Sequence, residues 1–250
     1  MKSIVHIITP IITEGIRSLD EVEPYLRPDL DIRHSLIDKG PASIECSADE
    51  ALSVPGLMEM AVAAERDGAN ALVIDCMGDP GLAACREMVS IPVLGPGETC
   101  MHHASMLGHR FAFVTVLDRL RPLIDDLVAH YGLQHNYAGF AAIDIPVLEL
   151  GTRLQEAVDL LALKSRESVV SQHAGAIILG CTGFFGCAEG IKTRLQESGI
   201  DVPVIDPIPL TLHIADALVK TGLSHSKHVY PPPRQKHLSG YKLPENYQIQ

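Results

Sequence analysis

The sequence has 250 residues, of which 46% are hydrophobic and 20% are charged, so we expect one large domain or two small ones that share a buried core. The net charge of −11 argues against a nucleic-acid or anionic-membrane partner, because such partners select clustered Lys and Arg. No apolar run approaches the roughly 20 residues that cross a bilayer, and Met1-Lys2-Ser3 leads into an apolar strand without a cleavage-site pattern, so we expect a cytoplasmic protein.

The first half of the chain alternates apolar strand patterns with helical ones. Thr13 is predicted to cap the first helix, and Ser53 with Pro55 to open the second. Asp79 is predicted to cap the third, because Pro80 suits its first position. The predicted elements are, in order, strand 4–9, helix 13–26, strand 32–38, helix 57–66, strand 71–75, helix 81–88, strand 93–95 and helix 98–107.

The second half repeats this alternation. Asp118 is predicted to cap its first helix, and Thr152 with Gln155 resembles a capping box for the longest helix. The tail from Ser224 is expected to be extended and to lie over the first half or over a neighbouring subunit. The predicted elements are strand 111–116, helix 120–131, strand 137–144, helix 152–173, strand 176–179, a helix that ends at 198, strand 202–206 and helix 210–220.

Two cysteines follow predicted buried strands at equivalent places in the two halves. Cys76 and Cys181 each end a short apolar run, and each is followed by a turn residue, a glycine and a helical pattern. Thr9 precedes Cys76 by 67 residues, and Thr115 precedes Cys181 by 66. A fixed internal period indicates a duplicated unit, here one of roughly a hundred residues.

This duplication predicts an α/β fold of two pseudo-symmetric lobes, each a mostly parallel sheet flanked by helices. Lobe one is expected to comprise residues 1–97 and 208–250 and to carry Cys76, and lobe two residues 98–207 with Cys181. Because open α/β sheets hold ligands at the carboxyl ends of their strands, the active site is expected in the cleft between the lobes. The two thiols would then lie on opposite walls.

The other cysteines, the histidines and Lys39 carry no comparable signal. The sequence contains no Cys-x-x-Cys pair, so we expect six free thiols in a reducing compartment. His102-His103 and the pair His225 and His228 lack a third ligand, and no glycine-rich phosphate cup accompanies Lys39. We therefore expect neither a metal nor a cofactor.

Two opposed cysteines suit the inversion of a carbon centre by proton transfer. One sulfur removes the proton from one face and the other delivers a proton to the opposite face, with little movement of the substrate. A free thiol has a pKa near 8.5, and we expect the helix that follows each cysteine to lower it toward neutrality. Backbone amides at Gly78-Asp79 and Thr182-Gly183 are expected to stabilise an enolate-like oxygen.

Residues near the two strand ends are candidate substrate contacts. We interpret Asp79 as a helix cap rather than an acid, whereas Thr182 suits a cap and a contact equally. Thr115 can simply end a strand, and Ser43 can simply shape a turn. The candidate contacts are Pro10, Thr13, Ser43, Ile44, Gly78, Thr115, Thr182 and Gly183.

Seven segments of the sequence together form a recognisable set: Gly40-Pro41-Ala42-Ser43-Ile44-Glu45, Ala63-Ala64-Glu65-Arg66, Val73-Ile74-Asp75-Cys76, Gly78-Asp79-Pro80-Gly81, Arg86-Glu87, Leu179-Gly180-Cys181-Thr182-Gly183 and Pro203-Val204-Ile205-Asp206. With these segments the chain resembles the hydantoin racemase branch of the aspartate/glutamate racemase superfamily over nearly its whole length. This resemblance implies a cofactor-independent enzyme with two α/β lobes and one catalytic cysteine from each, here Cys76 and Cys181. Many relatives have an Asn-Pro-Asn-type segment after the first strand, where this chain reads Thr9-Pro10-Ile11-Ile12-Thr13.

Three classes of function remain open from the sequence. The first is a racemase of 5-monosubstituted hydantoins, of allantoin or of another amino-acid derivative, acting as a homo-oligomer on a small molecule. The second is a decarboxylase of the same fold, which would need only one proton-donating thiol. The third is a two-lobed small-molecule binding protein, in which both thiols would be dispensable.

Overall fold

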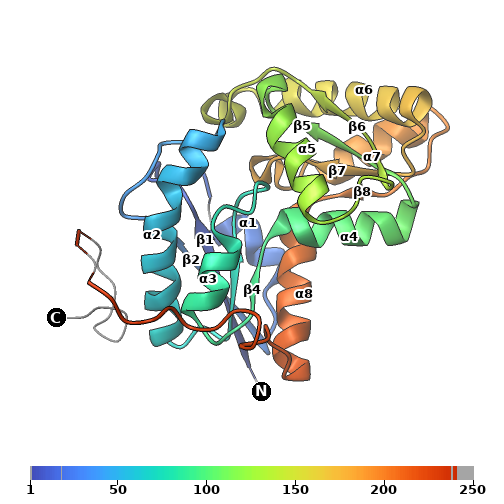
Figure 1. Ribbon diagram of the computed structural model, residues 1–250. Coiled ribbons are helices and arrows are strands. Elements are labelled where there is room, and N and C mark those ends of the chain that lie inside the picture. Colours follow the sequence, from blue (N-terminus) through green and yellow to red (C-terminus); the bar gives the residue numbers. More distant parts are fainter. Residues whose placement is uncertain (1, 18, 238, 241–250) are drawn as a thin grey trace.

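Two parallel four-stranded sheets organise the part of the chain that the computed structural model describes, residues 2–17, 19–237 and 239–240 (Figure 1). The first sheet has the order β2-β1-β3-β4 and the second the order β6-β5-β7-β8, so the two halves share one topology. The predicted α/β fold with duplicated halves is therefore confirmed. The strands are β1 (Ser3–Thr9), β2 (Leu30–Leu36), β3 (Ala71–Ile74), β4 (Val93–Leu94), β5 (Phe111–Thr115), β6 (Tyr137–Ala142), β7 (Ala176–Leu179) and β8 (Val204–Ile205).

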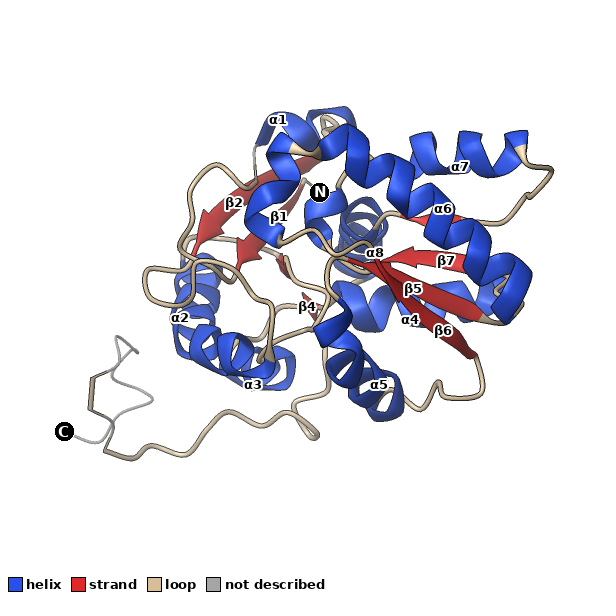
Figure 2. Ribbon diagram, turned by 90° about the horizontal axis from the view of Figure 1, so that it is seen from above, coloured by secondary structure: helices blue, strands red, loops and turns tan. Residues whose placement is uncertain are grey.

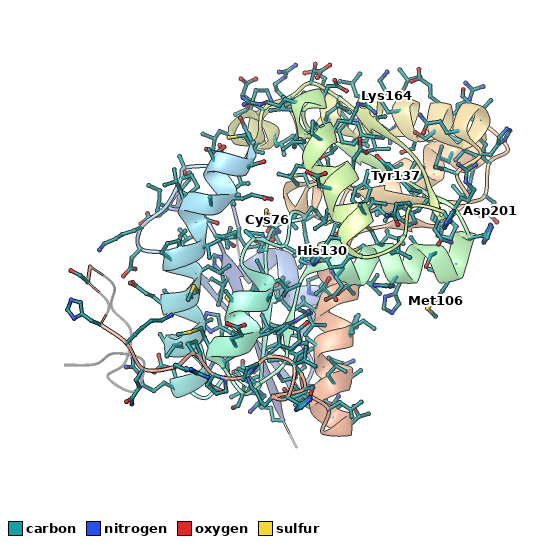
Figure 3. The ribbon with its side chains drawn as sticks, viewed as in Figure 1. Cys76, Met106, His130, Tyr137, Lys164 and Asp201 are labelled. Carbon is teal, nitrogen blue, oxygen red and sulfur yellow. The ribbon has the colours of Figure 1, made fainter. Side chains whose placement is uncertain are left out.

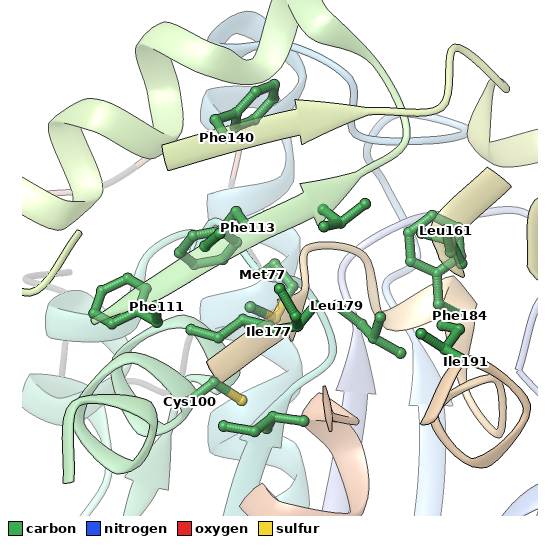
Figure 4. Packing of buried hydrophobic residues seen from close by; sticks show 14 of the residues in the cluster. Met77, Cys100, Phe111, Phe113, Phe140, Leu161, Ile177, Leu179, Phe184 and Ile191 are labelled. Atoms are coloured by element: carbon green, nitrogen blue, oxygen red, sulfur yellow. The ribbon is translucent and has the colours of Figure 1, made fainter. Parts of the chain in front are cut away.

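β3, β5 and β7 are buried along their whole length, and β1 is buried along its second half, as expected when helices cover both faces of a parallel sheet. β1 pairs with β3 through Ile8 and Ile74, and β5 pairs with β7 through Val114 and Leu179, so corresponding strands end level with each other. Figure 4 shows the packing around β5 and β7, where apolar side chains fill the space beside the sheet. The register therefore places the residues after β3 and β7 at corresponding sheet edges.

Helices cover both faces of each sheet (Figure 2). On the first sheet, α2 (Ser47–Arg66) and α3 (Leu82–Met88) pack against one face, and α8 (Pro207–Thr221) packs on the other. On the second sheet, α6 and α7 contact one face and α4 the other. The remaining helix bounds are α1 (Leu19–Val22), α4 (Pro96–Gly108), α5 (Arg121–His130), α6 (Leu154–Gln172) and α7 (Ala188–Glu197), with 3₁₀ turns at Glu23–Tyr25, Asp118–Leu120, Val147–Thr152 and Thr182–Phe184.

Two helices each follow a strand of one sheet but pack on the other sheet. α4 follows β4 of the first sheet but packs on β5 and β7 of the second, and α8 follows β8 of the second sheet but packs on β1, β3 and β4 of the first. α4 and α8 also contact each other along this boundary. We propose the division into residues 1–97 with 208–250 and residues 98–207, whose limits fall in the first turns of α4 and α8.

Three predicted helix starts are wrong. The segment after Thr13 forms no helix before Leu19, because the Thr13 hydroxyl donates to the Ala42 carbonyl oxygen (2.7 Å) instead of capping a turn. α2 begins at Ser47 rather than near Ser53, so Pro55 lies inside it.

The start of α6 also differs from the predicted capping box. Arg153 is its N-cap residue, and the Thr152 hydroxyl donates back to the Glu149 carbonyl oxygen (3.0 Å). The Thr152 hydroxyl therefore bonds within the preceding 3₁₀ turn and does not cap α6.

The segment from Ser224 to His237 crosses the first half of the chain, as predicted, and is extended apart from a turn at residues 227–229 (Figure 1). The Ser224 hydroxyl donates to the Ser90 carbonyl oxygen (2.7 Å), and the Lys227 ammonium donates to carbonyl oxygens at the end of α3. The final residues, 241–250, lie outside the described part of the chain. Among the described helices, none is long and apolar enough to cross a membrane.

The contact between α4 and the start of β7 depends on two glycines. A Cβ atom at Gly175 would lie 2.1 Å from the Gly108 carbonyl oxygen, which is backbone and cannot rotate away. We expect Gly175→Ala to lower the free energy of unfolding by about 1–3 kcal/mol through overpacking. A Cβ atom at Gly151 would meet no atom within 4 Å, so Gly151→Ala is the matched control and should stay within about 0.5 kcal/mol of the parent in urea denaturation. Equal stability of the two variants would contradict this explanation.

Candidate active site

Both candidate catalytic cysteines line one cavity at the junction of the two halves. Cys76 follows β3 and Cys181 follows β7, and both side chains line this cavity. Figure 3 shows Cys76 at the junction, between elements of the first half and those of the second. The cavity encloses about 70 Å³, which suits a small molecule rather than a polymer. Its other lining residues are Thr9, Pro10, Ile11, Ile16, Arg17, Ile44, Glu50, Asp75, Met77, Gly78, Val116, Leu120, Leu123, Ile124, Val147, Gly180, Thr182 and Gly183.

Burial dominates the protonation of both sulfurs. It raises the pKa of Cys181 to about 11, although the Gly183 amide donates to the sulfur (3.4 Å) and acts in the opposite direction. Burial and the neighbouring Glu50 charge raise the pKa of Cys76 well above its usual range, against a hydrogen bond from the Gly78 amide. Both groups are therefore thiols at neutral pH in this structure.

The predicted lowering of the thiol pKa by a helix N-terminus is wrong for this state of the protein. α3 begins only at Leu82, and the segment after Cys181 forms a three-residue 3₁₀ turn. Neither element supplies a helix dipole of the strength that was expected, so desolvation prevails. The amides of Gly78 and Gly183 hydrogen-bond to the sulfurs rather than point to a separate oxyanion position.

A buried ion pair lies directly beside Cys76. The Arg17 guanidinium donates to both oxygens of the Asp75 carboxylate, each at 3.0 Å, and the Thr9 hydroxyl donates to the same carboxylate at 2.7 Å. Burial alone would raise the pKa of Asp75, but the Arg17 charge and these hydrogen bonds hold it below its usual value. Asp75 is therefore ionised and is the counter-ion of Arg17 rather than a proton donor.

Arg17 also connects this ion pair to the second thiol segment. Its guanidinium donates to the Thr182 carbonyl oxygen (2.8 Å), and the Thr182 hydroxyl donates to the Asp75 carbonyl oxygen (3.3 Å). A second carboxylate, Glu21, pairs with Arg17 at 2.9 Å. The residues that follow β3 and β7 are therefore tied together by side chains that are themselves buried.

Asp79 caps a helix, but a different one from the helix predicted. Its carboxylate accepts hydrogen bonds from the Gly97 and Glu98 amides at the start of α4 (2.9 and 2.6 Å) and from the Tyr131 hydroxyl (2.7 Å). Asp79 itself has a φ of 51°, in the left-handed region that residues other than glycine seldom adopt. Burial raises its pKa to about 7 despite these hydrogen bonds.

The structure brings together some of the predicted contacts and separates others. Pro10, Ile44, Gly78, Thr182 and Gly183 line the cavity with both cysteines. The other three candidates do not line it, and their contact with a substrate stays a prediction. Thr115 is fully buried and donates to the Gly180 carbonyl oxygen, Thr13 bonds to Ala42, and Ser43 lies half-buried in the loop between β2 and α2.

Sequence reasoning missed the charged residues of the cavity and most of its apolar wall. Arg17 and Glu50 come from segments without a strand-end position, so nothing local marked them. Leu123 and Ile124 lie in the first turn of α5 and Leu120 ends the 3₁₀ turn before it, and the apolar spacing of these residues is the signal that could have indicated a wall.

Comparisons with known proteins place this geometry in context. A sequence model described as Asp/Glu/Hydantoin racemase matches residues 23–215. Hydantoin racemases of Rhizobium meliloti and Pseudomonas sp. (strain NS671) are 39% and 37% identical over 81% and 82% of this chain, and over 83% and 77% of their own lengths. The solved structure of allantoin racemase from Klebsiella pneumoniae superposes with a TM-score of 0.89 at 32% identity, covering 96% of this chain and 97% of that one.

The buried ion pair generates a stability prediction. Asp75→Asn leaves the Arg17 guanidinium without its principal counter-ion, so we expect the free energy of unfolding at pH 7 to fall by about 3–5 kcal/mol in urea denaturation. Because the folded state holds the pKa of Asp75 low, this contribution is present above the unfolded pKa of about 3.9 and is lost as pH falls through the folded pKa. The difference between parent and variant should therefore narrow toward pH 3.

The exposed pair between Arg153 and Glu156 provides the control, since solvent screens it. Glu156→Gln should change the unfolding free energy very little at either pH. A loss in D75N no larger than the loss in E156Q would contradict a stabilising role for the buried pair.

Proposed function

Because this chain belongs to the Asp/Glu/hydantoin racemase family and is an isomerase of the racemase class, we propose that it inverts the C5 centre of 5-monosubstituted hydantoins by proton transfer between Cys76 and Cys181. The observation that carries this proposal is the position of both sulfurs in one cavity, each delivered by the corresponding strand of its own sheet. Each sulfur would face one side of a flat intermediate.

In the proposed reaction, one sulfur acts as a thiolate and takes the C5 proton, which leaves the electron pair delocalised into the ring carbonyl. The opposite thiol then gives its proton to the other face of C5, so the two sulfurs exchange protonation states and nothing else is consumed. Turnover in the reverse direction restores the first state. A single thiol could carry out only half of this exchange.

The raised thiol pKa values affect this chemistry in two opposing ways. They make the thiolate scarce in the ligand-free protein, but a thiolate of high pKa is a stronger base toward a carbon acid. The amides of Gly78 and Gly183 donate to the sulfurs and so favour the thiolate once a proton has left. We propose that these amides stabilise the thiolate, in place of the enolate role that the sequence suggested.

The lining of the cavity favours an uncharged ring over a free amino acid. In the described part of the chain, Arg17 alone among the lining residues is cationic, and it is already paired with Asp75 and Glu21. A substrate carboxylate would therefore find no free counter-ion there. Much of the remaining wall is aliphatic, which suits an apolar C5 substituent. The likeness to allantoin racemase makes allantoin, with its polar C5 substituent, the second candidate.

We also propose a homo-oligomer in a reducing compartment such as the cytoplasm. All six cysteines are free thiols, which supports a reducing compartment. Leu163 and Val170 are exposed one heptad apart on α6, which supports a contact with a second copy. Sedimentation of the purified protein measures its oligomeric state.

We expect Cys76→Ser and Cys181→Ser each to reduce racemisation by at least 10³-fold, because a serine hydroxyl is a far weaker acid than a thiol. Polarimetry with an enantiopure 5-alkylhydantoin measures the rate, and circular dichroism establishes that each variant is folded. Cys85 is buried away from the cavity, so Cys85→Ser is the control for removal of a thiol. Full activity in either cavity variant would exclude a two-thiol mechanism.

In D₂O, we expect deuterium to enter C5 of the product enantiomer as racemisation proceeds, because the donated proton comes from an exchangeable thiol. NMR follows the label against an enzyme-free control.

A panel of 5-alkylhydantoins, allantoin, aspartate and glutamate ranks the substrates by kcat/KM, with the apolar hydantoins expected first. A decarboxylase would release CO₂ from a suitable acid without racemising these substrates, and a binding protein would leave every one unchanged.

A further inference from the structure

A third titratable group enters the cavity beside the Cys76 sulfur. Glu50 lies in the first turn of α2, and its side chain lines the cavity together with Cys76 and Gly78. A Cβ atom at Gly78 would lie 1.7 Å from the Glu50 carboxyl oxygen Oε1 and 2.9 Å from its Cδ. Any other residue at position 78 would therefore displace this carboxyl group, which lies directly against the backbone that follows Cys76.

Among the described residues, none forms a hydrogen bond or ion pair with the Glu50 carboxyl group; only burial and the Asp79 charge act on it. Its neighbours are committed elsewhere. The Asp49 carboxylate accepts from the Glu45 amide (3.0 Å), and the Glu45 carboxylate accepts from the Val147 amide (2.9 Å). This carboxyl group lies in the cavity wall with its hydrogen-bonding capacity unused by protein groups, so it is available to a ligand that enters the cavity.

The charges around Glu50 favour its neutral form. Burial and the nearby Asp79 charge raise the pKa of Glu50 to about 7, so a protonated carboxyl group is abundant at neutral pH. The cavity also presents the thiols of Cys76 and Cys181 and the buried pair of Arg17 with Asp75. The Arg17 charge is already balanced, so it does not hold Glu50 ionised.

We propose that Glu50 is a substrate-binding residue that recognises a ring amide, pairing its O–H with the ring carbonyl oxygen and its carbonyl oxygen with the adjacent ring N–H. A neutral carboxyl group has one donor and one acceptor side by side, and the cis amide of a hydantoin ring presents the complementary acceptor and donor. This inference rests on the proposed function and adds the group that selects a cyclic amide over a free amino acid.

The same contact links recognition to the reactivity of Cys76. The ionised form of Glu50 raises the pKa of the Cys76 thiol. A substrate that holds Glu50 neutral removes that negative charge and so makes the thiolate easier to form. Recognition of the ring amide therefore prepares the sulfur next to it.

Three variants separate hydrogen bonding from charge. Glu50→Gln keeps one donor and one acceptor but cannot ionise, so we expect kcat/KM within about fivefold of the parent at pH 6 and loss of the ionisation near pH 7 from the pH profile. Glu50→Ala removes both hydrogen bonds and should raise KM for hydantoins at least tenfold. Asp49→Asn, one position earlier on α2 and outside the cavity, is the matched control and should leave both constants and the profile unchanged.

A binding measurement tests the contact without turnover. 5,5-Dimethylhydantoin has the ring amide but no C5 hydrogen, so calorimetry in two buffers of different ionisation enthalpy gives its Kd and the protons taken up. At about one pH unit above the Glu50 pKa of about 7, the parent should take up close to one proton on binding, because free Glu50 is then mostly ionised and the complex holds it neutral. Asp79 also has a pKa of about 7, and the absence of uptake in E50Q would assign the proton to Glu50. A derivative methylated on both ring nitrogens should bind at least tenfold more weakly.

The outcomes distinguish this inference from the proposed function. If the parent racemises hydantoins but E50A keeps its KM and Kd, or E50Q takes up the same proton, the Glu50 inference is wrong and the proposed function stands. If the parent binds dimethylhydantoin with Glu50-dependent proton uptake but racemises no hydantoin, the inference is supported and the proposed function is wrong.

Discussion

The buried contact among Arg17, Asp75 and Thr182 is the constraint on which the site depends. Arg17 holds the carboxylate that precedes Cys76 and the carbonyl oxygen that follows Cys181, so one guanidinium fixes both thiol segments. A guanidinium suits this position because its planar fork donates to two groups in fixed directions. The separation of the two sulfurs is therefore set by protein groups before any ligand enters.

Burying these groups costs desolvation free energy, and the pKa shifts that result are part of the proposed chemistry. Bringing two thiols, the Glu50 carboxyl group and an ion pair into one apolar junction removes water from all of them, and that desolvation raises the pKa values of both thiols and of Glu50. Only Asp75, which Arg17 compensates, keeps a low pKa. The site is thus nearly uncharged at rest apart from a closed ion pair, which matches an uncharged substrate better than an ionic one.

The fold and the thiols could be predicted from the sequence because their signals are local and repeated. An apolar run that ends in cysteine, turn and glycine occurs twice in register, and Cys76 and Cys181 do reach one cavity. Arg17 could not be found in this way, since its partner lies 58 residues away and its own segment has no regular structure. The predicted direction of the thiol pKa shift was wrong for a related reason. The helical pattern after each cysteine is visible in the sequence, but the delayed start of the helix and the depth to which the sulfur is buried are not.

The exchange of α4 and α8 between the sheets has a consequence for how the molecule can be divided or redesigned. Each sheet has one face covered by a helix that the chain enters from the other sheet, so cutting out either half as a separate gene would leave an apolar surface bare on both products. Swapping halves between relatives would have to respect the same reciprocal packing. Although the two halves have the same topology, each depends on a helix that follows a strand of the other, so we expect the two halves to fold as one cooperative unit.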